Sequence, residues 1–354
     1  MSRHPNLTKV FVLVAALVFA TAGCSSGGET SSAPTTSSTL AEAPAATVAT
    51  VAYQPPEVVV AAADVDRLTK LAADYGDEMY GSWPDISAAT DRWADDIVSH
   101  DPLNDEWVLE GATVLVPLWR DTFAPYFPDA RWTVDNTYLS ANGVAYQAWS
   151  NLWPPWVETP SDPKTSEVDQ ITFDGDEVTS MSLWFADETA VAIGAGCFED
   201  AACEAEMQSI VDTYIDTWTS GNPDRIATLY APNAVLVDSM LGIHATGPDE
   251  ISRQAATRFG QGDSTVAATS AYVQTNGFRP PTEDSPESGL IFGVAIGYRT
   301  SDPAGDEVMN SITFIALGTL EPDGGTGRAV LHPEGLITHE EVFHANDTLA
   351  RLAK

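Results

Sequence analysis

Cysteines, histidines and carboxylates gather in two short segments where they could form a covalent bond or bind a metal ion. Cys197 and Cys203 are separated only by Phe-Glu-Asp-Ala-Ala. An even cysteine pair of this kind forms a disulfide in an oxidising compartment, and closing so small a loop stabilises a fold by about 2–3 kcal/mol. Two thiolates without a nearby histidine fall short of the four ligands of a structural zinc site. We therefore predict a disulfide here.

The second segment lies near the C-terminus. On a strand, His339 and Glu341 share one face, and Glu340 and His344 share the other. This spacing is not a metal-ligand pattern, so we expect a polar, exposed hairpin and no metal site. The chain also lacks a nucleophile elbow, a phosphate-binding glycine loop and a dinucleotide fingerprint, and we expect no cofactor. The other polar members of this segment are His332 and Glu334.

A third cysteine, Cys24, follows a segment typical of a secretory signal. Residues 1–9 are basic, residues 10–20 are an unbroken apolar run, and Thr21-Ala22-Gly23 are small. The run is too short for a permanent membrane helix, which needs about 20 residues. The small residues before Cys24 resemble the bacterial lipobox. They predict a signal peptide over residues 1–23 and a lipid on Cys24 that holds the exported protein at the membrane. The alternative is an ordinary secreted protein with an incidental cysteine.

The segment after Cys24 is expected to be a tether. Residues 25–52 are rich in Ser, Thr, Ala and Pro and have no large aromatic residue, so they cannot bury enough apolar surface to fold. A flexible chain of this length spans about 30 Å. We place the tether at residues 24–63.

The charge of the chain excludes one class of partner. The sequence has 51 acidic and 16 basic residues, for a formal net charge of −35. Such a surface offers no basic stripe for nucleic acid and no electrostatic attraction to anionic lipids. The predicted membrane contact therefore depends on the acyl chains of Cys24.

The folded part contains an internal repeat. Tyr75-Gly-Asp77 and Pro84-Asp85 recur, at one constant offset, as Tyr214-Ile-Asp216 and Pro223-Asp224. The repeat predicts two domains, at residues 64–196 and 204–354, with residues 197–203 as the linker.

Each half is expected to begin with helices and continue with strands. In the first half we predict helices over 65–80, 85–94 and 110–123, and strands over 131–139, 144–152, 167–173 and 178–185. In the second half we predict helices over 207–218, 224–230 and 248–259, and strands over 234–238, 265–274, 289–299, 309–320, 329–331 and 335–343.

The second half contains a series of short motifs: Tyr214-Ile-Asp-Thr-Trp218, Asn222-Pro-Asp-Arg-Ile226, Leu229-Tyr-Ala-Pro-Asn-Ala-Val235, Val237-Asp238, Leu241-Gly242, Gly247-Pro-Asp-Glu-Ile251 and His339-Glu-Glu-Val-Phe343. With these motifs it resembles the SnoaL-like branch of the NTF2-like superfamily. This resemblance implies an α+β fold in each half, a cone of three helices wrapped around a curved, mostly antiparallel sheet, with the two halves packed as an internal pseudo-dimer. Its members include cyclases, isomerases, dehydratases and binding modules, so the fold leaves the function open.

The resemblance also implies candidate site residues. Family members often carry an acid or base at the position of Asp238, and His244 near the cone mouth and the Tyr230 hydroxyl are its candidate helpers. The alternatives are a turn-capping Asp238, a solvated His244 and a core Tyr230. In the first half, His100 aligns with Asp238, so a shared mechanism is in doubt.

The first half is rich in aromatic residues. Trp149 and Trp153 flank Asn151-Leu152 and are candidates for the wall of a ligand pocket. The alternative is a core and a seam between domains filled with large rings. The other aromatic residues of these strands are Trp132, Tyr138, Tyr146, Trp156 and Trp184.

Three functions are compatible with the sequence. The first is a membrane-anchored module that binds a small, largely apolar molecule, and we prefer it because the catalytic pattern is incomplete. The second is a cyclase, isomerase or dehydratase in which Asp238 moves a proton. The third is a non-catalytic interaction module of the cell envelope, which would expose an apolar patch outside its cones.

Overall fold

The computed structural model describes residues 52–100, 108–151, 165–186, 201–261, 264–279, 289–320 and 337–352. These residues belong to one unit, Val51–Lys354. The predicted signal peptide, the lipid site at Cys24, the Cys197–Cys203 bond and Trp153 lie outside what the structure describes. None of the helices in the described part of the chain has the length and hydropathy of a membrane-spanning segment.

Helices open the first half and antiparallel strands close it. The helical elements are α1 (Ala62–Gly76), η2 (Asp77–Gly81), α2 (Ser87–Thr90), α3 (Ala112–Leu118), η3 (Trp119–Phe123) and α4 (Ala124–Tyr126). The strands are β1 (Trp93–His100), β2 (Val108–Glu110), β3 (Trp132–Ser140), β4 (Gly143–Ser150), β5 (Thr165–Asp174) and β6 (Glu177–Ala186).

The second half repeats this order. Its helical elements are α6 (Ala201–Thr219), α7 (Pro223–Ala227), α8 (Pro248–Ile251), η4 (Ser252–Gln254), α9 (Ala255–Phe259) and α10 (Asn346–Leu352). Its strands are β7 (Tyr230–Asp238), β8 (Ile243–Thr246), β9 (Thr265–Arg279), β10 (Gly289–Ser301), β11 (Glu307–Leu320) and β12 (Ile337–Ala345).

The two halves share a local device that sets the angle between a strand and the next helix. Gly111 precedes α3 and Gly247 precedes α8, both with φ in the left-handed region that favours glycine. The Gly111 amide donates to the Ile97 carbonyl at 2.7 Å, and the Gly247 amide donates to the Ala234 carbonyl at 2.8 Å. The same turn therefore joins β2 to α3 and β8 to α8, and a hydrogen bond holds it to β1 or to β7.

The short second helices are the clearest error of the sequence prediction. The helix predicted over 85–94 ends at Thr90, and Trp93 starts β1. The helix predicted over 224–230 ends at Ala227, and Tyr230 starts β7. Neither β8 nor α10 was predicted. The cause is tertiary, since β1 pairs in parallel with β6, and β7 with β12, over a long sequence separation.

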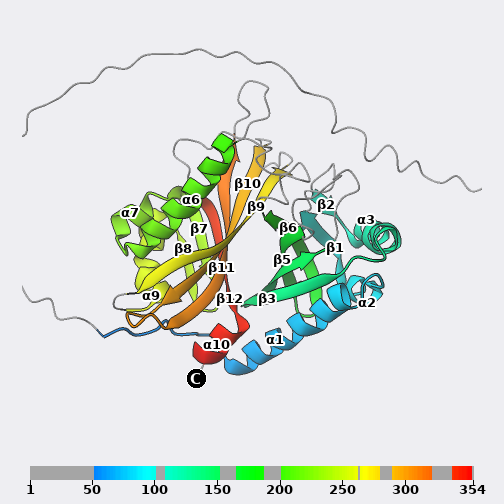
Figure 1. The fold of residues 1–354 in the computed structure, drawn as a ribbon, viewed down its shortest axis with the longest axis horizontal. Coiled ribbons are helices and arrows are strands. Elements are labelled where there is room, and N and C mark those ends of the chain that lie inside the picture. The colour runs from blue at the N-terminus through cyan, green and yellow to red at the C-terminus, as the bar shows by residue number, and fades with distance from the viewer. Residues whose placement is uncertain are drawn as a thin grey trace, which may run out of the picture. The chain divides into compact units, whose positions relative to one another are not determined.

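The sheets of the two halves join at two places, which gives the internal pseudo-dimer. β6 pairs with β9, and β3 pairs with β12, both antiparallel. In Figure 1, α6, α7 and α9 lie outside the strands of the second half, α2 and α3 lie outside those of the first half, and α10 lies beside α1 at one end of the strands. A buried cluster fills the seam between the sheets, and its large members are Tyr138, Val168, Trp184, Tyr272, Ile312, Phe314 and Phe343.

The folded unit begins before the predicted end of the tether at residue 63. Gln54 pairs with Gln261 as an isolated bridge, and the Val59 amide donates to the Met240 carbonyl at 2.9 Å. At Gly260 a side chain would clash, because an added Cβ would lie 2.3 Å from the Gln54 carbonyl oxygen. The segment from 53 to 60 therefore packs on the second half and is not a flexible tether.

A polar contact also crosses the seam. Gln170 Nε2 on β5 donates to Glu341 Oε2 on β12 at 3.0 Å. Burial raises the pKa of Glu341 from 4.5 to about 6, and the Gln170 hydrogen bond partly opposes this shift. A carboxyl whose folded pKa is raised favours the fold most below its unfolded pKa, and this contribution falls as the pH rises through the folded value.

The Glu341→Gln variant tests this contact. Because Gln mimics the protonated acid, we expect the variant to be more stable than the wild type at about pH 7.5, by up to about 2 kcal/mol. The difference should vanish below pH 4.5. Urea denaturation at both pH values measures it, with the exposed Glu57→Gln as a control. An equal effect of both substitutions would contradict the assignment.

Candidate functional site

We call the space between the helices and the sheet of each half its cone. The cone of the second half contains an ion pair between Glu340 on β12 and Arg258 on α9. Both side chains are 0% exposed, and Arg258 Nη2 lies 2.7 Å from Glu340 Oε1. Three hydroxyls donate to the carboxylate: Tyr214 at 2.6 Å, Thr313 at 2.9 Å, and Tyr230. The carboxylate is therefore fully coordinated by groups of its own half.

Aromatic rings enclose the guanidinium. The Arg258 Cζ atom lies 4.6 Å from the ring centroid of Trp218, 5.2 Å from Phe259 and 5.5 Å from Tyr298, distances typical of a cation–π contact. Its Nη2 also donates to the hydroxyls of Tyr214 and Tyr298. Nε and Nη1 have no hydrogen-bond partner among the described residues. The aromatic box and the carboxylate together hold a buried cation.

The tyrosines of this network are donors at all ordinary pH values. Burial, the largest cause, raises the pKa of Tyr214 and of Tyr230 well above 10, and the nearby Glu340 carboxylate raises both further. Arg258 opposes these shifts. Both phenols therefore stay protonated and hydrogen-bonded to Glu340.

Asp238 forms a second buried contact, with a partner that the sequence did not single out. His344 Nε2 lies 3.0 Å from Asp238 Oδ2, and His344 Nδ1 lies 2.8 Å from Ser311 Oγ. Because a carboxylate only accepts hydrogen bonds, His344 Nε2 donates to it, and the Ser311 hydroxyl is the partner of Nδ1. Asp238 Oδ1 also accepts from the Leu241 amide at 3.1 Å. This last bond caps the turn after β7, which is the alternative role predicted for Asp238 from the sequence.

His244 does not meet Asp238. On β8 it pairs with Val237 and is exposed, whereas Ile243 pairs with Asp238 and is buried. Since successive side chains of a strand point to opposite faces, His244 lies on the outer face. The structure therefore brings together Asp238 and His344, and leaves His244 in solvent.

The prediction of a polar, exposed C-terminal hairpin is wrong for β12. Glu340 and His344 do share one face, but that face points into the cone, and both side chains are 0% exposed. The alternation of polar residues along β12 contained this signal. The alternation could not show whether the face with Glu340 and His344 lies in solvent or inside the cone. The burial of β12 in the structure shows that it lies inside.

The acid–base groups of the second cone are closed to a substrate. Asp238, His344, Ser311, Glu340 and Arg258 are each 0% exposed, so no water-sized sphere contacts them. Their hydrogen bonds are made to one another and to the surrounding hydroxyls. In this conformation the network packs the second cone and holds its strands in register.

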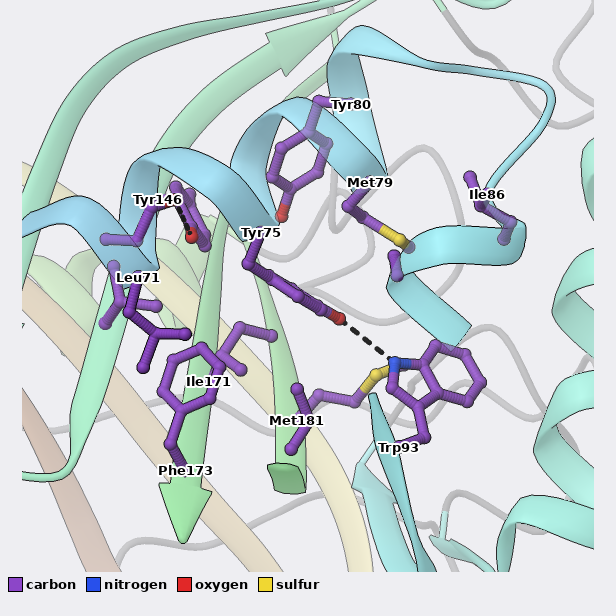
Figure 2. Packing of buried hydrophobic residues seen from close by; sticks show 14 of the residues in the cluster. Leu71, Tyr75, Met79, Tyr80, Ile86, Trp93, Tyr146, Ile171, Phe173 and Met181 are labelled. Atoms are coloured by element: carbon purple, nitrogen blue, oxygen red, sulfur yellow. Dashed lines mark hydrogen bonds between the residues drawn. The ribbon is translucent and has the colours of Figure 1, made fainter. Parts of the chain in front are cut away.

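The first cone, by contrast, encloses a cavity of about 50 Å³, which we call the first-half cavity. About 10–15 Å³ suffices for one water molecule, so several water molecules or a small ligand fit. Figure 2 shows Tyr75, Met79 and Tyr80 from the first helical segment facing Ile171 and Met181 of the sheet. Large rings form much of its remaining wall, namely Trp83, Trp119, Phe123, Trp132 and Phe185.

Two carboxylates of β5 line this aromatic cavity. Glu167 is 6% exposed and Asp169 is 8% exposed. Trp132 Nε1 donates to Glu167 Oε1 at 2.5 Å, and the Tyr80 hydroxyl donates to Asp169. Burial and the Asp169 charge raise the pKa of Tyr80 well above 10, so this phenol remains a donor. The first cone thus combines aromatic surface with negative charge.

Strand register changes the assignment of His100. β1 and β7 have the same order of buried and exposed positions from Trp93 and Tyr230 onward, and they pair with β6 and β12 through the same irregularity. In this register His100 corresponds to Val237. Burial lowers the pKa of His100, and the nearby Glu110 opposes the shift. The offset between the repeats is shorter in the strands than in the helices. The sequence alignment of the halves therefore matched His100 with Asp238, one position beyond its structural counterpart Val237.

The predicted aromatic residues divide between the two alternatives. Trp132 lines the first-half cavity, whereas Tyr138 and Trp184 pack in the seam. Trp149 precedes Ser150, which lines the cavity, so Trp149 lies on the opposite face of β4. Glu167 and Asp169 were not among the predicted site residues. Their alternation with Thr165 along one strand was the available signal.

No protein-family model and no curated protein matches this chain. Solved structures similar to it include an NTF2-like protein of unknown function from Cytophaga hutchinsonii, with 14% identity over 33% of this chain and 96% of that chain, at a TM-score of 0.28. An NTF2-like protein from Anabaena variabilis has 11% identity over 36% and 94%, at a TM-score of 0.30. A protein described as a SnoaL-like polyketide cyclase, from Jannaschia sp., has 16% identity over 34% and 85%, at 0.28. Each covers about the length of one half.

Breaking the buried ion pair should destabilise the fold strongly. The Glu340→Gln variant leaves Arg258 without its counter-charge, and we expect the free energy of unfolding to fall by about 3–5 kcal/mol. Arg225→Met is the matched control, because it removes the exposed pair with Asp216 and should cost less than about 1 kcal/mol. Urea denaturation followed by circular dichroism measures both. If both variants lose a similar free energy of unfolding, the buried pair does not contribute more to stability than the exposed pair.

Proposed function

We propose that this protein is exported, held at the membrane by a lipid on Cys24, and binds a small molecule in its first-half cavity. The observation that carries the binding proposal is the contrast between the cones. The first cone has a cavity lined by aromatic rings and two carboxylates, and ligand sites generally combine apolar walls with a few polar groups. The second cone is filled by side chains that are fully buried.

This contrast favours binding over catalysis. An acid or base must come within hydrogen-bond reach of its substrate, and Asp238 is bonded to His344 and Leu241 inside a packed cone. The second half supports the first by strand pairing across the seam. The large apolar side chains that are exposed in the described part of the chain are Val59, Val114, Tyr126 and Val134, whereas an interaction module would be expected to expose a larger apolar patch.

Retention of a ligand tests the binding proposal. We expect native mass spectrometry of the full chain, purified with detergent from the envelope of the native host, to detect a bound small molecule. The Trp132→Phe and Asp169→Asn variants should lose it, because each alters the cavity wall while changing few atoms. His244→Ala, on the exposed face of the second half, should retain it. The proposal fails if all four proteins are ligand-free, or if retention is the same in each.

Anchoring is tested separately on the full chain. We expect the wild type to partition into the detergent phase of a Triton X-114 extraction, because acyl chains supply about 0.8 kcal/mol per buried CH₂ group. Cys24→Ala should partition into the aqueous phase. Cys203→Ser, which removes a different cysteine, should behave as the wild type. A wild type that is found in the aqueous phase would contradict the lipid anchor.

A further inference from the structure

The pairing registers allow the two cones to be compared residue by residue. Ser99 pairs with Met181 between β1 and β6, and Leu236 pairs with Glu340 between β7 and β12. The order of buried positions along β6 and β12 agrees with this correspondence. Met181 of the first cone therefore stands where Glu340 stands in the second.

The carboxylate of the first cone lies one strand away. Leu183 pairs with Asp169 between β6 and β5, and Val342 pairs with Thr313 between β12 and β11. Asp169 thus occupies the position of Thr313, whose hydroxyl donates to the Glu340 carboxylate at 2.9 Å. Both cones therefore place a buried carboxylate in the same region, on neighbouring strands.

The second cone shows which group this arrangement holds. Its carboxylate receives tyrosine hydroxyls and the guanidinium of Arg258, and that cation lies among the rings of Trp218, Phe259 and Tyr298. A cation among aromatic faces and beside a carboxylate is stabilised by both.

The cavity of the first cone also combines aromatic rings with carboxylates. Its rings contact one another, with the centroids of Trp83 and Trp132 4.4 Å apart and those of Trp119 and Phe123 5.2 Å apart. Asp169 accepts from a tyrosine, as Glu340 does. The described residues that line the cavity include two carboxylates and no lysine, arginine or histidine.

The indole N–H of Trp119 in the cavity wall indicates that a ligand also carries a hydrogen-bond acceptor. The side chain of Trp119 is 7% exposed and lines the cavity, and its Nε1 has no hydrogen-bond partner among the described residues. A buried indole N–H favours an acceptor such as a hydroxyl oxygen.

We propose that the first-half cavity binds a small organic cation with an oxygen acceptor, in the place that the guanidinium of Arg258 takes in the second cone. This inference rests on the proposed binding function and names its ligand class. Glu167 and Asp169 keep their hydrogen bonds from Trp132 and Tyr80 when the cation binds next to them. In the same way, Glu340 of the second cone contacts both Tyr214 and Arg258. The rings supply its apolar contact, and Trp119 Nε1 donates to its oxygen.

A pair of probes of equal shape separates charge from apolar contact. Choline carries a quaternary ammonium and a hydroxyl, and 3,3-dimethylbutan-1-ol is its neutral carbon counterpart. By isothermal titration calorimetry at physiological ionic strength, which screens the acidic surface, we expect choline to bind at least about ten-fold more tightly than the alcohol. Asp169→Asn should weaken choline by about ten-fold and leave the alcohol unchanged. Glu341→Gln, which neutralises a seam carboxylate instead, should not alter choline binding.

The outcomes distinguish this inference from the function on which it rests. Equal affinities for the two probes, or an equal loss of choline binding in Asp169→Asn and Glu341→Gln, would overturn the cation inference. If neither probe binds while native mass spectrometry finds a retained molecule that Trp132→Phe releases, the cation inference falls and the binding function stands. If neither probe binds and nothing is retained, both fall.

Discussion

A carboxylate inside an apolar core must find donors or a counter-charge within the fold, because its transfer from water is otherwise too costly. In the second half this requirement is met at Glu340. The groups that meet it come from separate elements: Tyr214 from α6, Tyr230 from β7, Arg258 from α9 and Thr313 from β11. One ion pair thus ties the helices of this half to its sheet, and the position of each element is constrained by a hydrogen bond of defined length.

The same constraint explains how two related halves came to differ. The first half keeps the turn at Gly111 and the irregular pairing of β1 with β6, so its backbone matches the second half at these two places. Its polar groups, however, have moved from the last strand to β5, where Glu167 and Asp169 face aromatic rings. A cone packed around its own arginine is a structural core, whereas a cone with acids in an aromatic wall is suited to a ligand. Duplication with unequal filling can therefore separate stability from binding within one chain.

The seam joins the two differently filled halves into one folded unit. Strand pairs β6–β9 and β3–β12 join the sheets, and apolar side chains such as Trp184 and Phe343 fill the space between them. Paired edges leave fewer open strands for aggregation. Trp184 of the seam and Phe185 of the first-half cavity are neighbours on β6 and lie on its opposite faces, so the seam and this part of the cavity wall share a strand.

The sequence by itself determined the repeat, the helix-then-strand order of each half, most strand positions and the two faces of β12, since periodicity and turn residues are local properties. It also brought out Tyr230 and Asp238, which are both buried in the second cone. It did not determine that Asp238 meets His344 in place of His244, that β1 replaces the end of a predicted helix, or that Glu340 and Arg258 form a pair. These facts depend on parallel strand pairing between distant segments, on register shifts of one residue and on which face of a strand is covered. Only the tertiary structure decides these, because each is settled by contacts between residues far apart in the chain.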